Sequence, residues 1–120
     1  MNRGEHVWMV PAGDGTRVRS LAALQGLKLP PLGGDSNFSG PLLTRTLLVY
    51  ALTTGGTRGG PRLVAYDKAT GKELGSTDLP GAAIGTPMTY LINGRQHIAL
   101  TVQGSGGATA IPELVALALP

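Results

Sequence analysis

Hydrophobic and polar positions alternate along this chain in short apolar runs, separated by turns rich in glycine and proline. The runs predict strands at 47–52, 63–67, 96–102 and 114–119, with more polar strands at 72–79 and 87–92. The near-continuous apolar run at 47–52 is typical of a strand buried on both faces. Asn93-Gly94 lies between two apolar runs and predicts a tight hairpin, because both positions accept a positive φ.

The same strand and turn pattern occurs twice. A proline-led run starts at Pro41 and again at Pro87, and the triplet Leu-Val-Ala starts at Leu63 and again at Leu114. A period of about 40–50 residues with several short strands is the signature of β-propeller blades. We therefore predict an all-β chain with about two four-stranded antiparallel blades, the last of which lacks its fourth strand.

The repeat divides the chain into three parts. Residues 1–36 are expected to hold the end of one blade and a connecting loop, 37–80 one blade, and 81–120 the last, incomplete blade. The first part is predicted to contain a strand at 6–10 and one or two helical turns from Ser20, as N-cap, to Gly26. Because the chain opens in a strand-like segment, we expect a fragment that begins in mid-fold or a reading frame without its front half.

Composition narrows the class of protein. A length of 120 residues allows one domain, and 4% aromatic residues is low for a self-sufficient β core. The net charge of +3 comes from scattered arginines, which do not form the basic patch of a nucleic-acid-binding protein. The absence of cysteine excludes disulfides and thiolate metal sites. No apolar stretch is long enough for a membrane-spanning helix, and the first residues do not form a signal-peptide core.

The polar residues do not assemble a catalytic or metal motif. Asp67 is predicted to cap the turn that follows it rather than act as a base. His6 and His97 are the only histidines, and a metal site needs three or four convergent ligands. Asp14 and Asp35 are too few for calcium, which takes six to eight oxygen ligands.

A glycine-rich segment at 104–107 invites two functional interpretations that the residues do not support. A phosphate-binding loop needs a Gly-Lys-Ser/Thr ending, and a nucleophile elbow needs glycine where this chain has Gln103. We therefore predict a flexible connecting loop and no catalytic residue.

Four segments, at 62–74, 78–80, 85–98 and 113–120, resemble the C-terminal end of the dehydrogenases that depend on pyrroloquinoline quinone (PQQ), most of all the membrane glucose dehydrogenase type. The segments at 8–15 and 27–33 look like the same group. The resemblance implies an eight-bladed propeller with PQQ and calcium near its axis. It also implies a periplasmic enzyme that oxidises a sugar or alcohol hydroxyl, with an aspartate base and transfer of two electrons to the quinone.

The resemblance also assigns expected roles. Inner strands face the ring axis, so Phe38, Ser39, Gly40 and Thr86 are the cofactor-facing candidates, and Ser105 and Gly106 are expected to border the substrate mouth. The family's calcium ligands, base and most quinone contacts come from earlier blades. The chain alone is therefore expected to be inactive and to hold no cofactor, and its partners would be the missing N-terminal blades or other copies of itself.

The chain departs from the family pattern at two places, and the first of them, together with the absence of catalytic motifs, favours an alternative function. Gly75 stands where family blades carry a docking tryptophan, while Trp8 matches the docking position of the preceding blade. Residues 103–106 read Gln-Gly-Ser-Gly where sugar-oxidising members place a histidine after Gly-Gly. The alternative function is a non-enzymatic propeller module or scaffold, assembled from several chains, of which four would complete eight blades.

Overall fold

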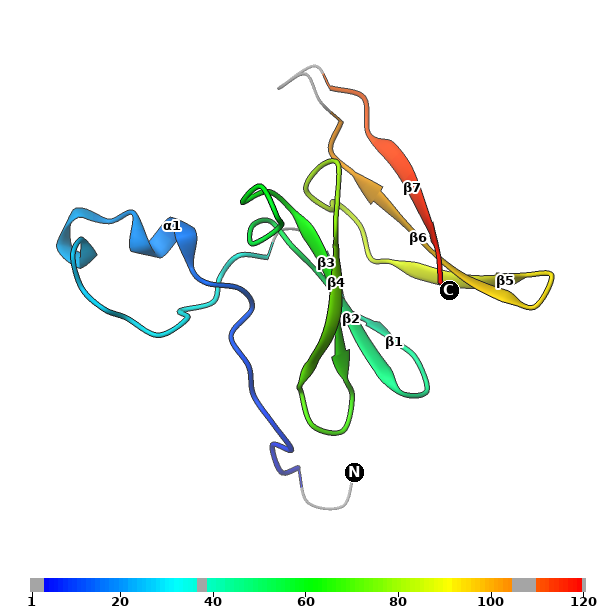
Figure 1. Ribbon diagram of the computed structural model, residues 1–120, viewed down its shortest axis with the longest axis horizontal. Helices are drawn as coiled ribbons and strands as arrows, with labels where there is room; N and C mark the ends of the chain where they lie inside the picture. Colours follow the sequence, from blue (N-terminus) through cyan, green and yellow to red (C-terminus); the bar gives the residue numbers. More distant parts are fainter. Residues whose placement is uncertain (1–3, 37–38, 105–109, 120) are drawn as a thin grey trace.

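The computed structural model describes residues 4–36, 39–104 and 110–119, which form two antiparallel sheets and one irregular segment. In Figure 1 the first sheet, drawn in green, lies between the segment that carries α1 and the second sheet, drawn in yellow to red. The described part has no helix long and apolar enough to cross a membrane.

The first sheet is a four-stranded meander in the order β1-β2-β3-β4. Its strands are β1 (Leu42–Leu43), β2 (Leu47–Leu52), β3 (Arg62–Asp67) and β4 (Glu73–Asp78). Val49 is paired with Ala65, and Ala65 with Gly75, before a register shift between Ala65 and Tyr66. The predicted strands at 47–52, 63–67 and 72–79 are thus confirmed to within a residue at each end.

The second sheet has three strands in the order β5-β6-β7. They are β5 (Met88–Ile92), β6 (Arg95–Val102) and β7 (Glu113–Ala118). Asn93 and Gly94 join β5 to β6 with φ values of 50° and 78°, as a two-residue turn with both central φ angles positive requires. Among the described residues this sheet has no fourth strand, in agreement with the prediction.

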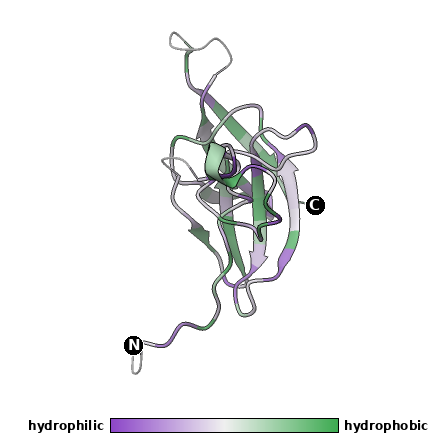
Figure 2. Ribbon diagram, turned by 90° about the vertical axis from the view of Figure 1, so that its left-hand side faces the viewer, coloured by the Kyte–Doolittle hydropathy of each residue, from purple (hydrophilic) through white to green (hydrophobic). Residues whose placement is uncertain are grey.

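The core lies between the two sheets. Val49, Ala51 and Leu63 of the first sheet form one buried cluster with Ile98, Leu100 and Val102 of the second. A smaller cluster of Leu52, Val64 and Tyr66 lies on the other face of the first sheet, where Ala12 packs against it. Figure 2 shows hydrophobic colour running along these strands. The strand β2 is thus buried on both faces, and the all-β prediction is confirmed.

The strand predicted at 6–10 is wrong. These residues form no strand and pair with no strand of the described chain. Trp8 instead crosses to the turn after β3, where its Nε1 donates a hydrogen bond of 2.9 Å to the carbonyl of Lys68. The side chain of Trp8 therefore anchors this segment in place of a strand ladder.

One helical turn lies within the predicted segment 20–26, and a second precedes it. The helix α1 spans Thr16–Arg19, and a 3₁₀ turn, η1, spans Ala22–Leu24. Ser20 is the C-cap of α1 rather than an N-cap, and its hydroxyl donates to the carbonyl of Arg17. The amides at the start of α1 are satisfied by Asp35, a residue far along the chain, which the local sequence pattern could not reveal.

Candidate functional site

The cofactor-facing candidates that the structure describes lie at the entrances of two strands. Ser39 and Gly40 precede β1, and Thr86 precedes β5. A Cβ built on Gly40 would lie 2.6 Å from the Oγ1 of Thr86, so glycine is the residue that allows these two segments to touch. Ser39 is buried and Thr86 is exposed. The structure therefore brings Gly40 and Thr86, predicted from two different repeats, into direct contact.

The remaining candidates lie outside the described residues. Phe38 precedes Ser39 directly, and Ser105 and Gly106 belong to the connection between β6 and β7. Their roles stay predictions.

Several connections gather at the end of the sheets where β2 ends and β3 begins (Figure 1). The segment before β5 approaches β6, because Ala83 bridges Val102 and the amide of Ile84 donates to the carbonyl of Thr101. The segment before β1 is held against the β2–β3 loop, where the amide of Thr53 donates to the carbonyl of Asp35 over 2.7 Å.

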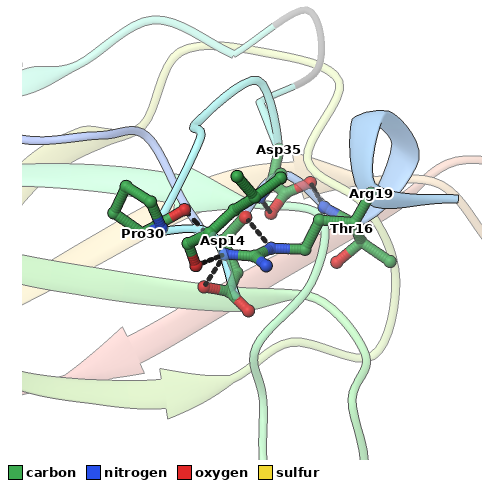
Figure 3. Close-up of polar contacts among 7 residues, drawn as sticks. Asp14, Thr16, Arg19, Pro30 and Asp35 are labelled. Carbon is green, nitrogen blue, oxygen red and sulfur yellow. Dashed lines mark hydrogen bonds and ion pairs between the residues drawn. The ribbon is translucent and has the colours of Figure 1, made fainter. Parts of the chain in front are cut away.

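Asp35 organises the segment that leads to Ser39 and Gly40. Its buried carboxylate accepts hydrogen bonds from the amides of Gly15 (2.7 Å) and Thr16 (3.0 Å), as Figure 3 shows for Thr16. Its carbonyl also accepts a bond of 2.9 Å from the hydroxyl of Thr53. A charged carboxylate that is buried needs such donors, because an unpaired one is costly. Asp35 therefore joins α1 to the first sheet.

Arg19 closes the same segment from the other side. Its guanidinium donates to the carbonyls of Asp14, Leu29 and Pro30 over 2.7–2.8 Å (Figure 3). Its contact with the carboxylate of Asp14 is longer, at 3.8 Å. The roles of Arg19 and Asp35 leave no signal in the sequence, because their partners are up to twenty residues away and are backbone atoms that any residue type would supply.

Asp67 has the structural role that the sequence predicts. Its Oδ1 accepts hydrogen bonds from the amides of Ala69 and Thr70 and from the hydroxyl of Thr70. These bonds, that of the Thr70 hydroxyl above all, hold the pKa of the Asp67 carboxyl below its usual value, because they favour the charged form. Asp67 is thus a partly exposed residue that caps a turn.

Asp78 has a similar role that sequence reasoning missed. Its carboxylate accepts hydrogen bonds from the hydroxyl and the amide of Thr57, which lowers its pKa. This contact holds the β2–β3 loop against the end of β4.

The histidines do not form a metal site. His97 stacks on Tyr90 with ring centroids 5.2 Å apart, and its Nδ1 lies 3.0 Å from the carbonyl of Arg95. Among the residues that the structure describes, no group of three or more histidine, aspartate or glutamate side chains is placed to hold a metal ion.

Gly75 faces a cavity between the two sheets. A Cβ at Gly75 would have no atom within 4 Å, apart from its own neighbours in the chain. The cavity, of about 270 Å³, is lined by apolar residues of both sheets, including Val49, Ala65, Ile98 and Leu117. The packing between the sheets is therefore open at the position where the resemblance places a tryptophan.

Comparison with known proteins identifies the family. The family model described as glucose/ethanol/alcohol dehydrogenase, beta-propeller domain, of the PQQ group, matches residues 1–98. Because this match covers most of the chain, the chain belongs to that family. The predicted membership and the predicted propeller fold are both confirmed.

The chain is similar to several quinone-dependent dehydrogenases. It is 31% identical over 115 residues to the quinate/shikimate dehydrogenase (quinone) of Acinetobacter baylyi. The alignment covers 94% of this chain and 13% of the relative. It is 35% identical over 99 residues to the quinoprotein glucose dehydrogenase of Gluconobacter oxydans. This alignment covers 77% of this chain and 10% of the relative. The solved structure of quinohemoprotein alcohol dehydrogenase from Comamonas testosteroni aligns with a TM-score of 0.48 and 27% identity, over 62% of this chain and 10% of that one.

The chain thus spans about a tenth of the length of the curated relatives it matches. Their enzymatic activities belong to proteins far longer than this chain.

Ser39, Gly40 and Thr86, the described candidates at the strand entrances, do not suffice to hold PQQ or calcium. Ser39 and Thr86 offer hydroxyl groups and Gly40 offers backbone atoms, whereas calcium binds six to eight oxygens that usually include carboxylates. The buried carboxylate of Asp35, which precedes these candidates in the chain, already accepts hydrogen bonds from two amides.

Proposed function

We propose that this chain is the C-terminal part of a PQQ-dependent dehydrogenase that oxidises a sugar or alcohol hydroxyl, of the membrane glucose dehydrogenase type. The observation that carries the proposal is the family match over residues 1–98. Quinoprotein glucose dehydrogenases of three organisms are among the relatives, which favours a sugar as substrate. The periplasmic location is part of the proposal because the family resemblance implies it. In this proposal residues 37–80 and 81–120 are the last two of eight blades.

The residues at the entrances of β1 and β5 would border the quinone in the complete enzyme. Phe38, Ser39, Gly40 and Thr86 would contribute to the wall that faces the ring axis, and Ser105 and Gly106 would border the substrate mouth. The contact between Gly40 and Thr86 supports this role, since it joins two inner-strand entrances. The bound quinone would accept the two electrons of the substrate, while the base and the calcium ligands would come from other blades. The isolated chain would therefore be inactive.

A chimera tests this proposal. The segment of the Escherichia coli quinoprotein glucose dehydrogenase that aligns with this chain, 32% identical over 94 residues, is replaced by the corresponding residues of this chain. We expect glucose oxidation with added PQQ and Ca²⁺ to be retained in the chimera. We expect none from the same enzyme with the segment deleted, and none from this chain alone.

Two variants make the result specific. Gly40→Val in the chimera should reduce PQQ binding, measured by equilibrium dialysis, because the new side chain would collide with Thr86 at the strand entrance. Gly75→Ala, at a position with open space, is the matched control and should leave PQQ binding unchanged. A folded chimera that binds no PQQ and oxidises no glucose would overturn the proposal, and turnover by the isolated chain would overturn its inactivity.

The second candidate is the non-enzymatic module assembled from several copies. A specific observation favours it: Leu114 and Met88, on the side of the second sheet that is turned away from the first, are 76% and 59% exposed, and a second copy could cover them.

A further inference from the structure

Lys68 and Leu119 occupy equivalent places in the two sheets. Lys68 follows β3, and its amide donates a hydrogen bond of 2.9 Å to the carbonyl of Thr46, the residue before β2. Leu119 follows β7, and its amide donates over 2.9 Å to the carbonyl of Gln96 in β6. Each lies five residues after the leucine that opens the repeated triplet Leu-Val-Ala. The surroundings of these two residues can therefore be compared directly.

An aromatic ring lies at this place on the first sheet. The Nε1 of Trp8 donates to the carbonyl of Lys68 over 2.9 Å. Trp8 also lines, together with Tyr66, a space beside the face of the first sheet that is turned away from the second. The indole of Trp8 thus lies at the end of β3 on that face.

The equivalent place on the second sheet is a cavity. Leu117 is the counterpart of Tyr66, since each lies three residues after the leucine of its triplet. Leu117 and Leu119 pack toward the buried cluster between the sheets, as does Val115, because side chains alternate along a strand. Leu117 and Leu119 line the cavity of about 270 Å³ that was described beside Gly75.

The opposite wall of this cavity belongs to the first sheet. Val49 and Ala65 line it, and Ile98 of β6 lies at the bottom, where Val49 is 2% and Ile98 is 4% exposed. Gly75, which pairs with Ala65, contributes no side chain, and a Cβ there would have no atom within 4 Å. Gly75 and Thr77 are exposed and form the mouth. The cavity therefore reaches from the edge of β4 into the core between two sheets that pack on each other.

The size and lining of the cavity suit a small planar aromatic molecule. Its lining side chains are aliphatic apart from the hydroxyls of Ser76 and Thr77, and no charged side chain lines it. An apolar cavity of about 150 Å³ with such a lining stays dry and binds benzene. A cavity of about 270 Å³ has room for a molecule of two fused rings.

We propose that the cavity beside Gly75 binds a small uncharged aromatic molecule of the size of indole, which lies against the end of β7 as the ring of Trp8 lies against the end of β3. The two walls and the ring on the first sheet carry this inference. It concerns binding by this chain and does not rest on the proposed enzymatic function.

Titration of the methyl-labelled chain with indole, followed by NMR, tests the proposal. We expect saturable shifts of the methyl signals of Ile98 and Leu117, with intermolecular nuclear Overhauser effects between these methyl groups and the ring of indole. The methyl signals of Leu52, which is buried on the other face of the first sheet, should stay in place. The midpoint of thermal unfolding should rise with indole concentration, because the ligand binds only the folded chain.

Two variants locate the site. Gly75→Trp adds an indole group of its own at the mouth, and should raise the thermal midpoint and abolish the saturable shifts. Leu91→Trp adds the same group at a residue of β5 that is 71% exposed and does not line the cavity, and should bind indole as the unaltered chain does. Circular dichroism checks that each variant is folded, and Gly75→Leu replaces Gly75→Trp if that variant is not.

Three outcomes would overturn the proposal. These are an unaltered chain without saturable shifts at Ile98 and Leu117, a folded Gly75 variant that binds indole as before, and a loss of binding in Leu91→Trp. The chimera described under the proposed function measures glucose oxidation and PQQ binding, so the two proposals fail separately.

Discussion

The indole nitrogen of Trp8 donates a 2.9 Å hydrogen bond to the carbonyl of Lys68, sixty residues later in the chain. The ring also lies against Gly71, where a Cβ would come 2.7 Å from Cδ2 of the indole. The turn capped by Asp67 thus provides both a carbonyl acceptor and a bare backbone surface for the only tryptophan. This contact fixes the first described residues to the first sheet.

Replacing Trp8 should destabilise the fold in two measurable steps. Trp8→Phe keeps a ring but removes the donor, and should lower the free energy of unfolding by about 1 kcal/mol. Trp8→Ala also removes the ring and should cost about 2 kcal/mol, less than for a fully buried tryptophan because Trp8 is half-buried. Urea unfolding followed by circular dichroism measures both values. A Trp8→Ala chain as stable as the original would show that the contact contributes nothing.

Gly71→Ala should destabilise the chain for two reasons that can be separated. The φ of Gly71 is 72°, which costs a residue with a Cβ about 1–2 kcal/mol, and the added carbon would collide with Trp8. In a Trp8→Ala background the collision is absent, so the loss caused by Gly71→Ala should be smaller there. A double-mutant cycle in urea measures the difference, and strictly additive effects would contradict the contact.

Gly75→Ala should stabilise the chain, whereas Gly71→Ala should destabilise it. The residue lies inside β4, and a Cβ there meets open space, so the substitution should raise the free energy of unfolding by about 0.5–1 kcal/mol. Gly75→Leu, which would also extend into the cavity between the sheets, should stabilise the chain further. Thermal unfolding of both variants beside Gly71→Ala measures the contrast. A loss of stability in Gly75→Ala would mean that the position needs glycine for a reason other than space.

Acid should remove the contribution of Asp67 to stability. The pKa of its carboxyl is lower in the folded chain than in the unfolded chain, so its stabilising effect is complete above the unfolded pKa, about 3.9, and is lost as the pH falls through the folded pKa. Thr70→Val removes the hydroxyl that contributes most. The pKa of Asp67, measured by NMR titration, should then rise, and the loss of stability below pH 4 should become shallower. An unchanged pKa in Thr70→Val would contradict this assignment.

Asp35→Asn should loosen the segment between Asp14 and Pro30 more than it affects the sheets. The carboxylate offers two oxygens to the amides of Gly15 and Thr16, whereas an asparagine offers one oxygen and an amide group that cannot accept. We expect a loss of about 1–3 kcal/mol. Faster hydrogen exchange should appear at Gly15 and Thr16, with little change in β6. Equal acceleration in both places would show that Asp35 acts on the whole fold.

Sequence reasoning succeeded where local chemistry decides the structure. The alternation in β2, the Asn93-Gly94 turn and the cap by Asp67 each depend on neighbouring residues, and each was predicted in place. Trp8 was predicted at a docking position, but the extended segment around it resembles a strand in composition. Its true partner is a turn sixty residues away, and sequence spacing carries no trace of that contact.

The candidate site was predictable only in part, for a similar physical reason. The resemblance predicts Ser39, Gly40 and Thr86 on inner strands that face one axis, and the structure brings Gly40 and Thr86 into contact. Asp35 and Arg19 act through backbone amides and carbonyls, which every residue possesses. Their roles become visible only once the chain has folded back on itself.

The contact between Gly40 and Thr86 links the sizes of two residues that are 46 positions apart. Any side chain at position 40 must occupy volume that the threonine now fills. A larger residue at one position therefore requires a smaller one at the other, and relatives that carry alanine or serine at the first should carry glycine or alanine at the second. The two repeats are thus constrained to change as a pair at the point where they meet.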